Sequence, residues 1–438
     1  MTNAQRFCLF FNIANFIGFA LFPQSKYVTI FLLAVSCLGL LFSATRNIKK
    51  NITYIFVCLL IFFIFTLIIT LISQYDLKIS TYILVLIQCF TAYVIGALNG
   101  VDDKVNKLFF KFIIVFMLIL SAYGLLIYYL PNYESKNTAG QTVQCTIILG
   151  IKLSQIIARE KNGPTGIASL TQNPNTFSFL LLLGAVAVLY FLFSREDAKK
   201  IGWKIALSLF FVLFIFTLFR AGSRMCIALS IVLVLMFDFF QVKSRKKSYL
   251  RSRFILIILL IGALIFAIMN YDKIVAQISF ASREELWAVF DNNKRKYVFI
   301  GAGLGSSLQM IIFETSLTLG MHNTYYSLWL EIGLIPFILI LLALLISIIY
   351  SYFVHLKTKE KTPSKLISGS QMTIIFTILL FGITESTIFT FSLFNYLFFY
   401  LVGAIIGKGS KDKNYSTPKP LDGGQDIDKC DNNDVQQK

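Results

Sequence analysis

Charged residues are scarce in this chain of 438 residues, in which Asp, Glu, Lys and Arg make up 14% and hydrophobic residues 57%. A soluble domain carries about 25% charged residues. The shortage argues against an ordinary water-soluble enzyme. The length would allow two or three soluble domains, but the long apolar runs predict a single polytopic membrane bundle instead.

Several chemistries lack the residues that they need. The seven cysteines form no C-x-x-C pair, which argues against a zinc site or a disulfide framework. Only two histidines occur, His322 and His355, and no carboxylates cluster with them, so no metal is expected. The chain has no P-loop, H-E-x-x-H or G-x-S-x-G motif. Gly301-Ala302-Gly303 is not preceded by a predicted strand and followed by a predicted helix, as a dinucleotide-binding glycine motif would be. We therefore expect no nucleotide and no other cofactor.

The apolar runs define the fold class. A helix needs roughly 20 mostly apolar residues to cross a bilayer. Twelve candidate spans meet this requirement, at about 7–22, 27–43, 52–73, 79–98, 109–130, 176–193, 203–219, 222–240, 254–270, 325–352, 366–384 and 386–407. The sequence thus predicts an all-α polytopic membrane protein of about 12 transmembrane helices, retained in the membrane without signal-peptide cleavage.

The positive charges orient this bundle. With the N-terminus inside, 27 of the 40 Lys and Arg residues fall on the inner side, as the positive-inside rule requires. Both termini are then cytoplasmic. The formal charge of +18 becomes mainly a topology signal, and no basic soluble domain remains to bind nucleic acid.

The bilayer also divides the chain into parts. Residues 1–407 form the membrane domain, and 408–438, rich in Lys, Asp, Asn and Gly, read as a disordered cytoplasmic tail. Two extracytoplasmic loops are long, 131–175 and 271–324, the second of them between helices 9 and 10. Long loops in a compact protein tend to be functional. Residues 143–158 within the first are expected to form an amphipathic interfacial helix.

Unusual polar residues gather on the outer face. Histidine exchanges protons near neutral pH, and His322 lies at the outer membrane surface. Arg220 and Arg224 occupy the turn between two apolar runs, where an arginine marks a binding site or reaches to lipid headgroups. Ser282 and Glu285 form a capping box, which predicts a helix start. Arg283 would then lie in its first turn, where a cation needs a partner, either an anionic ligand or a neighbouring glutamate.

Five motifs on this face resemble the O-antigen ligase and polysaccharide polymerase family of Wzy-like membrane glycosyltransferases. His322-Asn323, nine residues and Gly333 resemble its H-N-x9-G signature, with Pro336 departing from the pattern beyond it. Ser223-Arg224 resembles its outer Ser-Arg. The remaining elements are Arg283 with Trp287, Gly301 with Gly303, and Gln172-Asn173-Pro174-Asn175 ahead of a clean span.

The resemblance implies a metal-independent transfer at the outer face of the bacterial cytoplasmic membrane. The donor would be an oligosaccharide on undecaprenyl diphosphate. Arg224 and Arg283, with Arg220, would hold the diphosphate, and His322 would accept the proton of the attacking sugar hydroxyl. Asn323 and Glu331 would orient His322, bind sugar or simply pack, and Asn175 would bind substrate.

The acceptor distinguishes the alternatives. We favour a polymerase that extends surface polysaccharide such as capsule, with membrane lipid, a chain-length regulator and a flippase as candidate partners. The first alternative is ligase-type transfer to another acceptor. The second is a lipid-linked-oligosaccharide flippase or transporter, which would be expected to show internal repeats and midplane polar sites. No repeat is evident in the sequence.

Overall fold

The computed structural model describes most of the chain: residues 3–22, 79–136, 142–148, 151–158, 166–171, 173–194, 201–241, 281–316, 320–358, 362–390 and 392–412, with single helical positions between 30 and 71. Three predicted spans, 27–43, 52–73 and 254–270, lie wholly or largely outside the described residues. So does the predicted tail from residue 413. Residues 408–412 belong to the last helix and not to a disordered tail.

Seven described helices are long and apolar enough to cross a membrane. They are α4 (Ile79–Gly100), α5 (Asp103–Tyr129), α6 (Pro174–Phe193), α7 (Ile201–Ala221), α8 (Arg224–Gln241), α14 (Leu334–Lys357) and α15 (Pro363–Phe381). The helices α1 (Asn3–Leu21) and α16 (Leu393–Asp412) contain shorter apolar stretches. The chain is thus a multi-pass membrane protein, and each of these nine helices overlaps a predicted span.

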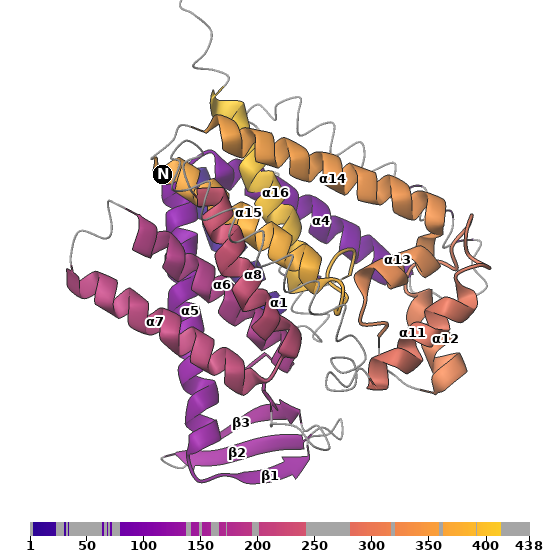
Figure 1. The fold of residues 1–438 in the computed structure, drawn as a ribbon, viewed down its shortest axis with the longest axis horizontal. Helices are drawn as coiled ribbons and strands as arrows, with labels where there is room; N and C mark the ends of the chain where they lie inside the picture. Colours follow the sequence, from indigo (N-terminus) through magenta and orange to yellow (C-terminus); the bar gives the residue numbers. More distant parts are fainter. Residues whose placement is uncertain are drawn as a thin grey trace, which may run out of the picture.

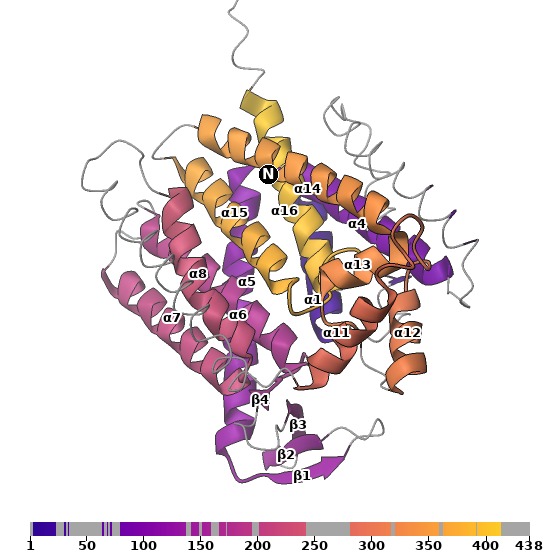
Figure 2. The same cartoon turned by 45° about the vertical axis from the view of Figure 1, so that its right-hand side comes forward.

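The ends of several helices meet at one end of the bundle. At one end of the bundle, Lys408 Nζ lies 3.0 Å from Asp103 Oδ1 and donates to the carbonyl of Ser364, joining the end of α16 to the starts of α5 and α15. The start of α1 lies at this same end (Figures 1 and 2). The start of α1 and the end of α16 therefore lie at the same end of the bundle, while the side of the membrane that this end faces stays a prediction.

The protein is not all-α. Residues 131–171 contain a four-stranded antiparallel sheet in the order β1 (Tyr133–Lys136), β2 (Thr142–Ile148), β3 (Ile151–Ala158) and β4 (Gly166–Ile167). The prediction of an interfacial helix over 143–158 is therefore wrong. That segment is dense in Val, Ile and Thr, whose branched side chains favour strands, and it folds back on itself as a hairpin. Figure 1 shows the sheet beyond the far end of α5.

A second correction concerns the predicted span 325–352, which is two helices. α13 (Thr324–Ile332) ends at Gly333, and α14 begins at Leu334. Gly333 has φ +89°, and an added Cβ there would lie 2.9 Å from the carbonyl oxygen of Phe299. Only glycine suits both this backbone conformation and this close approach. The break lets α13 leave the bundle and join α11 (Ala281–Asn293) and α12 (Ser306–Thr315). These three are called the outer helices because they lie outside the bundle of long helices.

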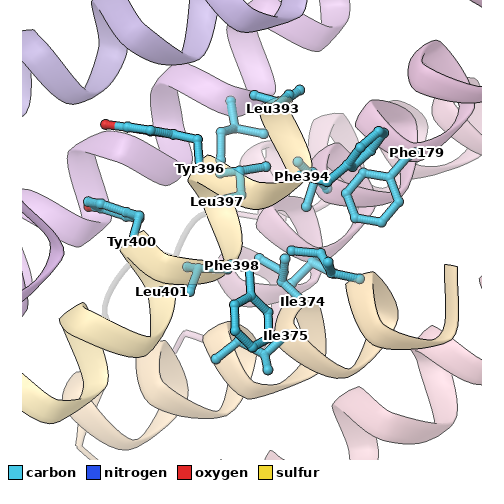
Figure 3. Close-up of a cluster of buried hydrophobic side chains, with 14 of the residues drawn as sticks. Phe179, Ile374, Ile375, Leu393, Phe394, Tyr396, Leu397, Phe398, Tyr400 and Leu401 are labelled. Carbon is cyan, nitrogen blue, oxygen red and sulfur yellow. The ribbon is translucent and has the colours of Figure 1, made fainter. Parts of the chain in front are cut away.

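A cluster of aromatic side chains packs at the end of the bundle opposite Lys408. Phe179 of α6 packs edge-on against Phe394 of α16, at 4.9 Å between ring centroids, and stacks on Phe381 of α15 at 5.2 Å. Figure 3 shows Phe179 and Phe394 within the cluster that α16 makes with Ile374 and Ile375 of α15. Because Phe381 ends α15 and Phe394 opens α16, this cluster fixes both ends of the turn at residues 382–392.

Candidate functional site

Four segments that are far apart in the sequence meet at the carboxylate of Glu385. Asn175 donates from Nδ2 to Oε1 at 2.6 Å. Arg283 Nη2 reaches the same oxygen at 3.1 Å, and His322 Nδ1 lies 3.0 Å from Oε2. The side chains of Arg283 and His322 are 24% and 28% exposed, against 11% for Glu385. Three predicted site residues therefore share one partner, and two of them remain accessible from outside.

Glu385 belongs to the turn between α15 and α16. This turn lies beside α11 and α13 (Figure 2). The backbone N–H of Glu385 donates to the carbonyl of Phe381 at 3.0 Å, which continues the last turn of α15. The aromatic cluster described above holds both ends of this turn. The carboxylate is thus presented from a fixed backbone to the helices around it.

Thr324 fastens this turn to the start of α13. Its hydroxyl donates to the carbonyl of Glu385 at 2.9 Å and accepts from the backbone N–H of Thr387 at 2.6 Å. Its own N–H donates to the carbonyl of Gly382 at 2.8 Å. His322, two residues earlier, has φ +48°, a left-handed conformation that is uncommon for a residue with a side chain. One buried threonine therefore fixes the relative position of His322 and Glu385.

For the glycan transfer that the motifs predict, Thr324→Val should lower kcat by roughly tenfold, because it removes a hydroxyl that makes buried hydrogen bonds worth about 1 kcal/mol or more together. The KM for the donor should change little, since Thr324 acts through His322 and Glu385. Thr324→Ser keeps the hydroxyl and should retain most activity. Steady-state kinetics of the three proteins checks this expectation, and an equal loss in both variants would contradict it.

Four helices begin at this site. α6 starts one residue before Asn175, α11 two residues before Arg283, and α13 two residues after His322. α8 starts at the exposed Arg224 and contacts the same place, since Cys226 Sγ lies 4.0 Å from the carbonyl oxygen of Asn175. Helix N-termini carry partial positive charge. Together with Arg224 and Arg283, they make this end of the molecule suited to an anion.

Arg220 stands apart from the Glu385 contacts. Its guanidinium lies 5.5–5.7 Å from the ring centroids of Tyr128, Tyr129 and Phe216. The side chain is exposed, and cation–π contacts of this kind hold an arginine in place while leaving its donors available. It is the last basic residue of α7, one short turn from Arg224.

Asn323 and Glu331 make contacts within the outer helices. Asn323 caps α13, because its side-chain oxygen accepts from the N–H groups of Tyr325 and Tyr326 at 2.9 and 3.1 Å. Glu331 is buried and accepts from the hydroxyls of Ser307 and Ser327. Neither contacts Glu385 through a side-chain hydrogen bond in the described part of the chain. Their contacts fit the packing alternative better than sugar binding.

Burial raises the pKa of Glu331, although hydrogen bonds from Ser307, Ser327 and the backbone of Gly305 oppose the shift. A carboxyl whose folded-state pKa is raised binds protons more readily when folded, so its contribution to stability falls as pH rises through that pKa. In Glu331→Gln this dependence should disappear. The apparent Tm of the wild type should fall relative to that of the variant as pH increases from about 4.5, the ordinary pKa of a glutamic acid side chain.

Thermal unfolding of both proteins across pH 4.5 to 8 tests this expectation. Curves that stay parallel over that range would show that Glu331 does not titrate differently in the folded state.

Sequence reasoning did not single out Glu385 or Thr324. Glu385 falls between two predicted spans, in a turn that the predicted topology places on the outer face. A carboxylate alone between two apolar runs on that face was the available signal. Among the described residues no group of three or more His, Cys, Asp or Glu side chains is placed to hold a metal ion.

Comparisons with known proteins agree with the motifs. Residues 209–341 match a family model described as O-antigen ligase, which confirms the predicted resemblance. The matched range includes every quoted motif except Gln172–Asn175. The search of curated proteins found no match. One solved structure, titled "Structural coordination of polymerization and crosslinking by a peptidoglycan synthase complex", aligns over 88% of this chain and 97% of its own, with 13% identity and a TM-score of 0.35.

Proposed function

Because residues 209–341 match the O-antigen ligase family, we propose that this protein is a membrane glycosyltransferase that polymerises lipid-linked oligosaccharide repeat units. The donor is an oligosaccharide on undecaprenyl diphosphate. The product is a surface polysaccharide, made on the outer face of the bacterial cytoplasmic membrane. The observation that carries the proposal is the single carboxylate of Glu385, which joins Asn175, Arg283 and His322.

His322 is the base of the proposed reaction. In the tautomer that is protonated on Nδ1, this N–H donates a hydrogen bond to Glu385 Oε2, and Nε2 keeps a free lone pair. Nε2 can then accept the proton of a sugar hydroxyl on the acceptor. The resulting imidazolium is stabilised by the adjacent carboxylate, as in other base–carboxylate pairs. Glu385 acts here as a positioning residue.

The diphosphate of the donor is the leaving group. The acceptor oxygen forms a bond to the anomeric carbon, the bond from that carbon to the phosphate oxygen breaks, and its electron pair stays on the lipid diphosphate. Arg283 and Arg224 face the developing charge, aided by the surrounding helix N-termini. Arg220 adds a third cation from α7. The activated donor supplies the driving force, so the proposal requires no metal ion.

Two other functions use the same donor. A ligase would move the glycan once, to a different acceptor, and would need the same base and the same cations. A flippase would carry the donor across the bilayer and would not need His322 paired with a carboxylate. The Glu385–His322 contact favours transfer over transport. A chain-length regulator and a flippase remain candidate partners of the polymerase.

Reconstitution separates the three functions. Purified protein in lipid receives undecaprenyl-diphosphate oligosaccharide with EDTA, and the products are resolved by glycan length. A ladder supports a metal-independent polymerase. Single transfer to an added second acceptor, without a ladder, supports a ligase. Movement of intact donor across the bilayer without any transfer supports a flippase and contradicts the proposal.

A further inference from the structure

The segment that joins α11 to α12 runs beside the point where α14 begins. The N–H of Leu334, the first residue of α14, donates to the carbonyl of Val298 at 2.9 Å. The N–H of Ala302 donates to the carbonyl of Leu330 at 2.9 Å. These bonds pin both sides of Phe299 and Ile300 to the α13–α14 junction. Because α14 is a candidate span, this junction lies at the membrane boundary.

Two apolar side chains of this segment project outward. Phe299 is 72% exposed and Ile300 is 56% exposed. The first outward-facing residues of α14 itself, Ile335 and Ile338, are 48% and 45% exposed, as expected of a helix surrounded by lipid. Transfer of apolar surface out of water is favourable. Side chains held at the same level as the start of α14 can reach the same apolar medium.

Basic residues precede these apolar ones. Arg295 and Lys296 are exposed, and Lys296 Nζ lies 5.2 Å from the ring centroid of Tyr297. Lys294 forms an ion pair with Asp291 at 2.5 Å. Cations beside aromatic and aliphatic side chains are typical of segments that lie in a membrane interface. Each such cation is attracted to a surface of anionic headgroups.

We propose that residues 294–300 form a membrane contact of the outer helices. Phe299 and Ile300 enter the leaflet at the Glu385 end of the bundle, and Arg295 and Lys296 bind the phosphates of its headgroups, preferring anionic lipids. The contact attaches α11, α12 and α13 to the bilayer beside the start of α14. It holds the helices that carry Arg283 and His322 close to the headgroup layer. It does not depend on the reaction that the protein catalyses.

Photocrosslinking tests the contact. The photoreactive residue p-benzoylphenylalanine replaces Phe299 in one protein and Ala288, an exposed position on α11, in the control. Each protein is placed as one copy per nanodisc in a mixture of phosphatidylcholine and phosphatidylglycerol. We expect lipid adducts at position 299 at several times the level at position 288. Equal adducts at both positions, or adducts only to protein, would overturn the proposal.

The charges are tested in the same discs. Adducts at position 299 should contain more phosphatidylglycerol than the lipid mixture does. In the double variant Arg295→Gln, Lys296→Gln, their composition should return to that of the mixture. An enrichment unchanged by the two substitutions would show that these cations do not bind headgroups. Neither readout involves glycan transfer, so the outcome is independent of the proposed polymerase activity.

Discussion

Glu385→Gln should lower kcat by roughly 10²- to 10⁴-fold, by analogy with other pairs of a histidine base and a carboxylate. The amide can donate a hydrogen bond to Nδ1 of His322, which favours the tautomer protonated on Nε2. That tautomer cannot accept a proton from the acceptor. The substitution also removes the negative partner of Arg283. Glu284→Gln, at an exposed position of α11, is the matched control and should remain near wild type.

The carboxylate and the imidazole should behave as one unit. If Glu385 acts through His322, the double variant Glu385→Gln, His322→Gln should be little slower than His322→Gln alone, because residues of one catalytic unit are not additive. Polymer formed per minute, in protein purified at equal monodispersity, is the measurement. Additive losses would separate the two residues and remove Glu385 from the proposed positioning role.

The outer arginines and the histidine could be selected from the sequence because they break local rules. An arginine between two apolar helices and a cation in the first turn of a helix are each unfavourable alone. The structure shows the compensation for Arg283, which is the carboxylate of Glu385. The sequence could not supply that partner, because 102 residues separate the pair and only tertiary packing brings them together.

Local patterns predicted helices better than strands. The apolar runs identified all seven long spans of the described chain, because a membrane helix satisfies its own backbone and needs only length. The hairpin of β2 and β3 depends on pairing between Val143 and Ile156, and between Cys145 and Ser154. The polar residues of this segment do not alternate regularly with the apolar ones. The sequence therefore carries no local pattern that predicts this strand pairing. The apolar and polar residues of 143–158 instead suggest an amphipathic helix, although the branched residues among them favour strands.

The break at Gly333 shows a further limit. The residues from 325 to 352 read as one apolar run, and the glycine within it could be tolerated by a continuous helix. α13 ends because a segment distant in the sequence packs against the chain at this point. The carbonyl of Val298 in that segment accepts a hydrogen bond from the N–H of Leu334. An added Cβ at Gly301 would lie 2.3 Å from the carbonyl oxygen of Glu331. Both glycines serve a contact between segments that the sequence alone does not reveal.

Gly403→Leu should prevent the protein from folding, because α16 and α4 pack backbone against backbone. An added Cβ at Gly403 would lie 2.1 Å from the carbonyl oxygen of Tyr93, and one at Gly96 would lie 2.0 Å from that of Tyr400. Small residues four apart on each helix, Gly96 with Gly100 and Gly403 with Gly407, permit this approach. A leucine would force the two helices apart along most of their length.

Gly403→Ala should have a graded effect. One methyl group forced into a packed contact costs about 1–3 kcal/mol, enough to lower the apparent Tm by several degrees. Gly202→Ala in α7 is the control, because an added Cβ there meets nothing within 4 Å. Thermal stability in detergent, followed by size-exclusion chromatography, compares the three variants. If Gly403→Leu gave a monodisperse protein with unchanged Tm, then α4 and α16 would not be in contact through these glycines. The position of α16, and with it of the turn that contains Glu385, would then have to be fixed by other contacts.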